Sequence, residues 1–241
     1  MPTVSEIRVW YDRLYASKGL ASMRPREAYP GFLNVLAIRP GARLLDVSCG
    51  AGFLLEAAAA RGVHAFGIDL SAEAVRLAAQ TAPDAGVAVG AGERLPFRAA
   101  AFDYVSCLGS LEHFVDMAEG LQEMLRVAAP DARLCIMVPN GDFIGWKLLG
   151  RRGTAQQDIN ERLLPLREWR ALFEANGLEL LRVLPDRWHA RRWRLEQGRR
   201  SGWGRRALGL LLELGWSGVP LRWQYQFIFV LRRRSTPPSA R

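Results

Sequence analysis

The sequence predicts a doubly wound α/β fold with a mostly parallel, seven-stranded sheet and a helical cap. Two observations carry this prediction. From Arg43 onward, short apolar runs alternate with segments of helical periodicity, an alternation typical of a parallel sheet covered by helices on both faces. A glycine-bearing turn, residues 48–52, follows the first of these runs. Because ligands of open α/β sheets bind at the carboxyl ends of strands, this turn marks the expected site.

Seven apolar runs are predicted as strands. They are Arg43–Val47, Ala65–Ile68, Val87–Val89, Tyr104–Cys107, Leu134–Val138, Glu179–Leu184 and Tyr225–Leu231. Apolar residues at helical spacing predict helices over Val4–Ala16, Phe53–Arg61, Ala72–Thr81, Met117–Val127 and Leu166–Ala175. Two of these helices also have start signals, because Ser71 precedes one and the pair Asp116 and Glu119 opens another.

The composition argues against several classes of protein. The sequence has three cysteines, Cys49, Cys107 and Cys135. Because their number is odd and they lie far apart, they do not indicate a disulfide-stabilised fold. With three histidines and no CxxC pair, we expect no metal site. The first residues lack a signal-peptide pattern, so we expect a cytoplasmic protein. The net charge of +9 comes from 31 arginines and only two lysines. Genome base composition can produce that skew, so charge alone is weak ground for predicting an anionic partner.

The turn after the first strand has the chemistry of a nucleoside site. Gly50 and Gly52 allow a tight turn and close approach of the backbone to a ligand, and the helix that follows is expected to offer free N–H groups to a carboxylate. Asp69 stands 17 residues after Gly52, at the end of the second predicted strand. An acidic residue there can accept hydrogen bonds from both ribose hydroxyls. The alternative is that Asp69 only caps or solvates a loop.

The nucleoside is expected to be S-adenosylmethionine rather than NAD. A dinucleotide turn needs a third glycine for helix–strand packing, but Phe53, Leu54 and Leu55 follow Gly52. Asp46 would also place negative charge beside a pyrophosphate. The same carboxylate is favourable beside the ammonium group of S-adenosylmethionine.

These motifs resemble those of the class I methyltransferases, especially the branch that methylates quinones, lipids, sugars and natural products. The resemblance covers roughly residues 40–184. It is carried by the segments Asp46–Gly52, Gly67–Ser71, Gly90–Phe97, Phe102–Val105, Leu111–His113 and Leu134–Asn140. It implies a Rossmann-like sheet and the cofactor S-adenosyl-L-methionine. The cofactor-binding residues expected on these grounds are Asp46, Ser48, Cys49, Gly50, Gly52, Asp69, Leu70, Gly92, Glu93 and Leu108.

Two residues depart from the family pattern. Ser48 stands where the family usually has glycine, so we expect a slightly different turn rather than lost binding. Ala91 stands where an Asp or Asn often holds the adenine amino group, and alanine cannot form that hydrogen bond. Glu93 or backbone groups near Gly92 are expected to substitute.

The catalytic candidates are Glu112 and His113, which in the family face the cofactor and acceptor. His113 is a candidate general base because its reference pKa is near neutrality. The alternative is a histidine that only orders the loop or lines the pocket. Tyr11 and Tyr15, on the opening helix, are expected either to line the site or to belong to the core.

The predicted parts of the chain are then five. They are a helical cap (1–40), a cofactor-binding methyltransferase core (41–184), a basic insertion (185–222), the last strand of the core (223–232) and a disordered tail (233–241). The insertion holds nine arginines against three acidic residues, a net charge of 9 − 3 = +6, and four tryptophans. It is interpreted as a substrate lid or membrane contact, with a plain cap, a dimer surface or a nucleic-acid contact as alternatives.

The expected function is methyl transfer to a small-molecule, lipid or lipid-linked acceptor. The expected location is the cytoplasm, either free or peripheral to the inner face of the membrane. The alternatives are an RNA methyltransferase that uses the basic insertion on phosphates, or a non-catalytic S-adenosylmethionine-binding protein. Residues 107–110, Cys-Leu-Gly-Ser, stand where many nucleic-acid amino methyltransferases have an (Asn/Asp)-Pro-Pro-aromatic motif, which argues against N-methylation of bases.

Overall fold

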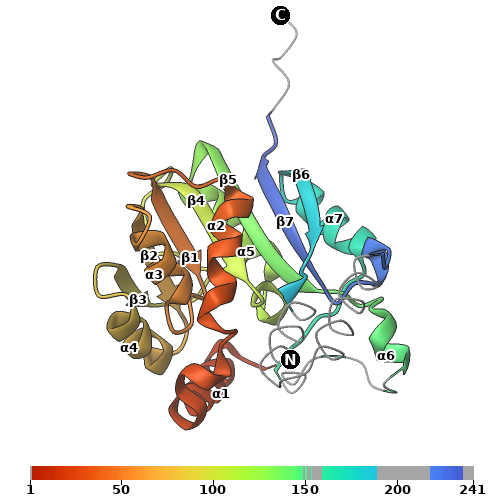
Figure 1. The fold of residues 1–241 in the computed structure, drawn as a ribbon, viewed down its shortest axis with the longest axis horizontal. Coiled ribbons are helices and arrows are strands. Elements are labelled where there is room, and N and C mark those ends of the chain that lie inside the picture. Colours follow the sequence, from red (N-terminus) through yellow and green to blue (C-terminus); the bar gives the residue numbers. More distant parts are fainter. Residues whose placement is uncertain (1, 149, 151–152, 154–158, 189–217, 236–241) are drawn as a thin grey trace, which may run out of the picture.

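The computed structural model describes residues 2–148, 150, 153, 159–188 and 218–235, and its centre is a seven-stranded sheet (Figure 1). The strands are β1 (Arg43–Val47), β2 (His64–Asp69), β3 (Gly86–Val89), β4 (Phe102–Leu108), β5 (Ala128–Pro139), β6 (Leu178–Pro185) and β7 (Gln226–Arg233). Their order in space is β3-β2-β1-β4-β5-β7-β6. β1 to β5 are parallel, whereas β7 is antiparallel to both β5 and β6. The predicted mostly parallel, seven-stranded sheet is therefore confirmed.

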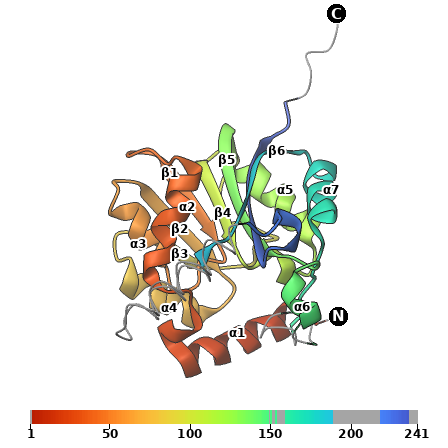
Figure 2. The ribbon, with the colours of Figure 1, turned by 45° about the vertical axis from the view of Figure 1, so that its right-hand side comes forward.

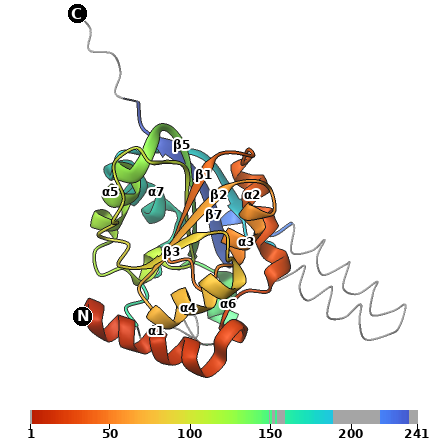
Figure 3. The ribbon, with the colours of Figure 1, turned by 90° about the vertical axis from the view of Figure 1, so that its left-hand side faces the viewer.

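Helices cover both faces of this sheet. They are α1 (Val4–Lys18), α2 (Tyr29–Leu36), α3 (Phe53–Ala59), α4 (Ala72–Thr81), α5 (Met117–Val127), α6 (Ile144–Leu148) and α7 (Leu166–Ala175). Figure 3 shows α5 and α7 on one face, α2 and α3 on the other, and α1 outside both layers. The buried apolar side chains divide in the same way. One cluster packs with α5 and α7, and the second packs with α2, α3 and α4.

The predicted helix boundaries hold where the sequence has cap signals. α4 and α5 begin and end as predicted. The Ser71 hydroxyl accepts a hydrogen bond from the backbone N–H of Ala74 (3.1 Å). Asp116 accepts two, from the N–H groups of Ala118 and Glu119. These bonds satisfy N–H groups that have no partner inside the helix, which fixes the starting residue.

Residues 1–40, predicted as a cap, are divided between two positions. α1 lies across the carboxyl edge of the sheet (Figure 2). α2 instead packs on the sheet face beside α3, with Phe32, Leu33 and Leu36 buried. Within this cap, the sequence analysis predicted a helix only over Val4–Ala16, so α2 is an additional helix. Its Pro30 lies in the first turn, where the missing N–H of proline costs nothing.

α1 is fastened to the start of α4. The Ser71 hydroxyl donates a hydrogen bond to the Asp12 carboxylate (2.6 Å), and the Glu73 N–H lies 3.3 Å from the same oxygen. Because Ser71 also caps α4, one side chain joins the two helices. α1 is therefore held over the edge at which parallel strands present ligands.

Much of the basic insertion, residues 189–217, lies outside the described residues, as do residues 236–241 of the predicted tail. The insertion connects the end of β6 to the start of β7. β7 continues through Arg233, one residue beyond the predicted end of the core. In the part of the chain that the structure describes, no helix is long and apolar enough to cross a membrane.

Candidate active site

In the turn between β1 and α3, every second residue has a positive φ angle. Ser48, Gly50 and Gly52 have φ values of 60°, 53° and 80°, in the region that only glycine adopts without strain. A Cβ at residue 50 would lie 2.6 Å from Met23 Cε, and one at residue 52 would lie 3.0 Å from the Cα of Ala78. The backbone conformation favours glycine at both positions. At residue 52 the close contact with Ala78 adds a second requirement, whereas at residue 50 the contact is with the flexible end of Met23.

The N–H groups of this turn are largely used within the protein. Cys49 N–H donates to the Ile68 carbonyl (3.0 Å), Gly50 N–H to the Asp69 carboxylate (2.8 Å) and Gly52 N–H to the Cys49 carbonyl (3.0 Å). These three groups precede α3, whereas the free donors predicted from the sequence are those at the start of that helix, Phe53 onward. The Cys49 side chain is also buried in the core, on the α2–α3 face of the sheet. Ser48 is the turn residue that lines a cavity.

Asp69 ends β2 and joins the turn to α4. One carboxylate oxygen accepts from Gly50 N–H and the other from Ser71 N–H (2.9 Å). Burial raises the pKa of Asp69 to about 6, and these two hydrogen bonds oppose that rise. Each carboxylate oxygen can accept a second hydrogen bond. Asp69 lines a cavity, so it retains the capacity to accept ribose hydroxyls.

Asp46 lies beneath the turn and in neither of the two cavities at this edge. It is buried, and the Ser106 hydroxyl donates to it over 2.6 Å. Burial raises its pKa to about 7, with a further rise from the Asp69 carboxylate. Its negative charge therefore acts on the site through the turn rather than by direct contact.

The first cavity lies between α1 and the carboxyl ends of β1, β2 and β4. It is lined by Val4, Ile7, Tyr11, Tyr15, Ser48, Asp69, Leu70, Ala91, Gly92, Glu93, Ser110, His113, Phe114 and Val115. Five of the predicted cofactor residues are among them: Ser48, Asp69, Leu70, Gly92 and Glu93. Its volume is about 60 Å³, which is small beside the roughly 300–1,000 Å³ of typical small-molecule sites. The lining residues nevertheless include groups that suit a nucleoside.

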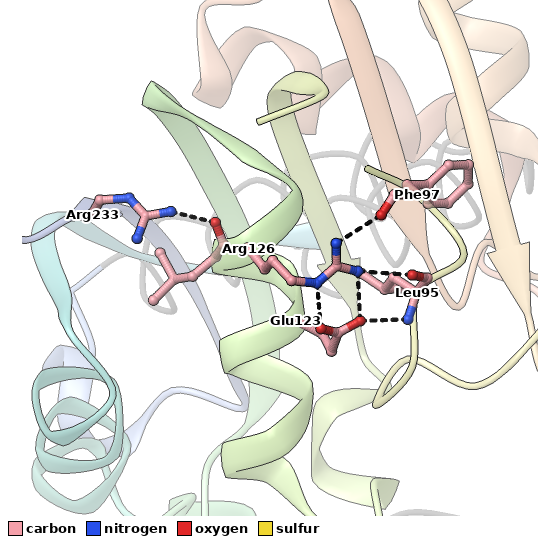
Figure 4. A network of polar contacts seen from close by, with 6 residues as sticks. Leu95, Phe97, Glu123, Arg126 and Arg233 are labelled. Atoms are coloured by element: carbon pink, nitrogen blue, oxygen red, sulfur yellow. Dashed lines mark hydrogen bonds and ion pairs between the residues drawn. The ribbon is translucent and has the colours of Figure 1, made fainter. Parts of the chain in front are cut away.

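The loop after β3 forms one wall of this cavity and is clamped by α5. Arg126 donates to the carbonyls of Phe97 (2.7 Å) and Leu95 (2.8 Å) and pairs with Glu123, which accepts the Leu95 N–H (Figure 4). Glu93 accepts the Val115 N–H (3.0 Å), which joins the loop to the segment after β4. The loop that replaces the missing adenine ligand at Ala91 is thus held rigidly.

A second cavity of about 330 Å³ adjoins the first. Its lining residues are Tyr11, Tyr15, Ser22, Met23, Arg24, Tyr29, Phe32, Ser48, Leu108, Gly109, Ser110, Glu112, Met137, Tyr225 and Gln226. Four of them, Tyr11, Tyr15, Ser48 and Ser110, also line the first cavity. The volume falls within the range of small-molecule sites. Tyr11 and Tyr15 therefore line the site, which settles the open question about them.

Glu112 and His113 face different cavities although they are neighbours. Glu112 lines the second cavity and is buried, and its Oε2 has no hydrogen-bond partner among the described residues. Burial raises the pKa of Glu112 to about 8, and the Glu161 carboxylate raises it further. His113 lines the first cavity. Its Nδ1 lies 2.9 Å from the Ile159 carbonyl, so Nδ1 carries a proton and donates to it.

Several lining residues were missed by the sequence analysis. Met23, Arg24, Tyr225 and Gln226 come from both ends of the chain and meet only in the folded protein. Arg24 donates to the Gln226 side chain (2.9 Å) across 202 positions of sequence. No local pattern marks such a contact. In the ranges that the structure covers, no group of three or more His, Cys, Asp or Glu residues is placed to hold a metal ion.

Comparisons with known proteins bear on this arrangement. Residues 45–136 match the family described as "Methyltransferase domain". This segment of the chain is therefore similar to a methyltransferase domain, in agreement with the resemblance of its motifs. S-adenosylmethionine is the cofactor that the glycine turn and Asp69 predict for such a domain.

Relatives of the methyltransferase domain have curated names. The ubiquinone biosynthesis O-methyltransferase of Hahella chejuensis is 35% identical over 130 residues, which are 52% of this chain and 54% of that protein. The enzyme of the same name from Xylella fastidiosa (strain 9a5c) is 30% identical over 144 residues, 58% of each chain. The chain therefore spans about half the length of the curated relatives it matches.

A solved structure shows the same fold over nearly the whole chain. The [4+2]-cyclase SpnF is 18% identical, with a TM-score of 0.70 and 98% of both chains covered. At this identity the likeness concerns the fold alone. The methyltransferase domain and its additions therefore follow an architecture that is already known.

Proposed function

We propose that the whole chain is an S-adenosylmethionine-dependent methyltransferase that acts on a small-molecule acceptor bound in the second cavity. The observation that carries this proposal is the meeting of two cavities at Ser48 and Ser110. One has the groups for a nucleoside, and the other has the size of a small ligand. Two ligands held end to end at this junction are positioned for in-line transfer, which lowers the entropic part of the barrier.

The cofactor residues of this proposal are those of the first cavity. Asp69 accepts the ribose hydroxyls, Glu93 and the backbone at Gly92 hold the base, and Leu108 lies toward the junction. When bound, S-adenosylmethionine would supply an electrophilic methyl group on its sulfonium. Tyr11 and Tyr15 line both cavities, and their electron-rich faces favour positive charge at the junction.

The proton of the acceptor goes to Glu112 in this proposal. Glu112 is the carboxylate of the second cavity, whereas His113 faces the cofactor side and is held by Ile159. For an O-methylation, the acceptor hydroxyl loses its proton to Glu112 Oε2 as the new O–CH₃ bond forms. The bound cofactor would supply that methyl group by breaking its S–CH₃ bond and would leave as neutral S-adenosylhomocysteine. A carboxylate with a pKa of about 8 is a stronger base than an ordinary glutamate. His113 then acts as a positioning residue.

The acceptor class we propose is a phenolic or quinol-like aromatic compound. The second cavity is walled by Tyr29, Phe32 and Tyr225 together with the apolar Leu108 and Met137. The curated relatives are named for O-methylation in ubiquinone biosynthesis, and a hydroxylated aromatic ring fits both observations.

The test uses the full purified chain. Calorimetry should show one-to-one binding of S-adenosylhomocysteine and no binding of NAD. Mass spectrometry should then show methyl transfer from S-adenosylmethionine to catechol or 3,4-dihydroxybenzoate. Cofactor binding without transfer to a panel of phenols, amines and thiols would favour a non-catalytic binding protein, and preferential NAD binding would refute the proposal.

We further propose that residues 185–222 form a substrate lid that contacts an anionic membrane surface. Asp186 belongs to this segment and pairs with Arg24, which lines the second cavity, and Gln226, which follows the segment, lines the same cavity. Arginines and tryptophans together suit an interface between water and lipid. Sedimentation with anionic and neutral liposomes at two salt concentrations tests this, with Arg199, Arg200, Arg205 and Arg206 changed to Gln as the variant. Equal, negligible binding to both liposomes would remove the membrane contact, and a salt-dependent shift with RNA would favour the nucleic-acid alternative.

A further inference from the structure

Arg24 is a buried cation in the wall of the second cavity. It follows α1 and lies at the carboxyl edge of the sheet, where Asp186 and Gln226 also lie. Its Nη2 is 2.7 Å from Asp186 Oδ2, 2.9 Å from Gln226 Oε1 and 3.4 Å from the Met137 sulfur. Its side chain is 13% exposed. The guanidinium is therefore fixed in place by three contacts on a single nitrogen.

The other terminal nitrogen of Arg24 has no such contacts. Nη1 is buried and has no hydrogen-bond partner among the described residues. A guanidinium has five N–H donors, and leaving buried donors of a charged group unpaired is costly. Buried polar groups without partners call for an explanation such as an absent water or ligand. Because Arg24 lines a cavity large enough for a ligand, a ligand oxygen is the partner we consider.

The surroundings of Arg24 select the kind of ligand group. Nη2 is already paired with Asp186. Because the guanidinium is planar, its remaining N–H donors suit a planar group of oxygen atoms such as a carboxylate. Glu112, the other charged residue of this cavity, is an acid and is a candidate for the opposite end of a ligand. Tyr29, Phe32 and Tyr225 line the space with aromatic rings. The cavity thus combines a basic side chain, an acidic side chain and an aromatic lining.

We propose that Arg24 binds a carboxylate in the second cavity. This inference rests on the proposed function and adds a specificity-determining residue to it. The carboxylate has two possible sources, because the cavity also includes Ser48 and Leu108 at the junction with the cofactor site. It belongs either to the amino-acid end of the cofactor or to the acceptor. If Arg24 only stabilised the fold, its substitution would affect ligands with and without a carboxylate equally.

The first arm of the experiment compares two nucleosides that differ at the amino-acid end. S-adenosylhomocysteine has the carboxylate, and methylthioadenosine lacks it. If the cofactor is the source, Arg24→Gln should weaken S-adenosylhomocysteine about tenfold or more, the range expected for a charged hydrogen bond, and leave methylthioadenosine unchanged. Arg26→Gln is the matched control, because Arg26 is exposed, pairs with Glu56 and lines neither cavity.

The second arm compares acceptors. If the acceptor is the source, kcat/KM for 3,4-dihydroxybenzoate should exceed that for catechol, and Arg24→Gln should remove this preference while the catechol rate changes by less than threefold. Equal losses for both members of each pair would overturn the proposal. Failure of every phenol as a methyl acceptor would instead count against the proposed function, and the nucleoside arm would still decide the role of Arg24.

A second variant guards against misfolding. Arg24→Lys retains the charge beside Asp186 but has one nitrogen, so it cannot serve two carboxylates in the same geometry. We expect Arg24→Lys to keep the thermal unfolding temperature close to that of the parent and still lose the discrimination. Full discrimination by Arg24→Lys would refute the assignment.

Discussion

At the scale of single residues, Ser48 carries conformational strain. Its φ of 60° is the conformation that the two glycines of the same turn adopt without cost. The sequence analysis expected a slightly different turn at Ser48. The structure gives this serine the left-handed backbone conformation that glycine adopts more easily. We predict that Ser48→Gly raises the free energy of unfolding by about 1 kcal/mol, because the strain disappears. Urea denaturation measures this.

The control is Ala100→Gly, at another residue of positive φ (53°) that lies in neither cavity of the site. It should stabilise the protein by a similar amount. Only Ser48→Gly should also change the affinity for S-adenosylhomocysteine. A less stable Ser48→Gly protein would show that the serine side chain stabilises the turn by more than the strain costs.

Asp69 gives cofactor affinity a pH dependence. Its pKa of about 6 means that the carboxylate is protonated in acid, and the protonated form accepts ribose hydroxyls less well. We predict that the affinity for S-adenosylhomocysteine rises as the pH increases from 5 to 7. Asp69→Asn should bind more weakly, and its affinity should be flat over this range. Calorimetry at several pH values measures both quantities, and an unchanged affinity in Asp69→Asn would exclude Asp69 as the ribose ligand.

The two catalytic candidates are separable by rate and binding. We predict that Glu112→Gln lowers the rate of methyl transfer about 10²–10⁴-fold, as for loss of a general base, with little change in cofactor affinity. The rate of the parent protein should rise with pH toward the pKa of about 8. His113→Ala should change cofactor affinity more than rate. The reverse pattern would make His113 the base.

Sequence alone could predict the residues whose role is set locally. The turn glycines and Asp69 follow from spacing, because a strand, a turn and a helix are consecutive in the chain. Which cavity Glu112 and His113 face could not be predicted, since it depends on the segment at Ile159 packing against them. Arg24 could not be recognised because its partners lie more than 100 residues away.

At the scale of elements, α1 forms one wall of the first cavity. Its residues Val4, Ile7, Tyr11 and Tyr15 line the cavity, and Asp12 joins the helix to Ser71. We predict that Asp12→Ala speeds the hydrogen exchange of α1 amides and increases the dissociation rate of S-adenosylhomocysteine by about tenfold, as expected when a charge-assisted hydrogen bond is lost. Exchange mass spectrometry and stopped-flow fluorescence measure the two effects.

Arg13→Ala is the matched control for that variant, because Arg13 is exposed on the same helix. It should leave both rates unchanged. If Asp12→Ala dissociates cofactor as slowly as the parent, α1 does not limit release. The sequence predicted the existence of α1 from its apolar stripe, but its position over the site depends on a contact 59 residues away.

Element boundaries show where local signals suffice. α4 and α5 begin where predicted because Ser71 and Asp116 cap them. α7 also has its predicted bounds, although no side chain caps its start. β5 was predicted from Leu134, yet it begins at Ala128. Its first residues include the exposed Asp131 and Arg133, so the apolar pattern is missing although the backbone is already extended.

At the scale of the whole molecule, three buried carboxyl groups affect stability. The pKa values of Asp46, Asp69 and Glu112 are raised to about 7, 6 and 8 by burial. The folded protein therefore holds protons on these groups that the unfolded chain releases above about pH 4. Because the folded state binds more protons, its stability due to these groups decreases as the pH rises from about 4 to 8.

We predict that the thermal unfolding temperature is higher at pH 5.5 than at pH 8.5. Glu112→Gln cannot lose a proton, so the difference between the two pH values should shrink. Glu174→Gln is the control, because Glu174 is exposed on α7 and should leave the difference unchanged. Differential scanning calorimetry provides these values. An equal pH dependence in Glu112→Gln and the parent would show that Glu112 is ionised in the folded protein at both pH values.

The antiparallel placement of β7 has a consequence for how such proteins diverge. β6 and β7 are neighbours, and the Asp186 N–H donates to the Gln226 carbonyl (3.0 Å), so the chain returns to the point from which it left. A connection with adjacent ends can lengthen, shorten or be exchanged between genes without disturbing the register of any strand. The domain match ends at residue 136, before this connection begins. The length and composition of this connection can therefore vary independently of the strand order and of the turn after β1.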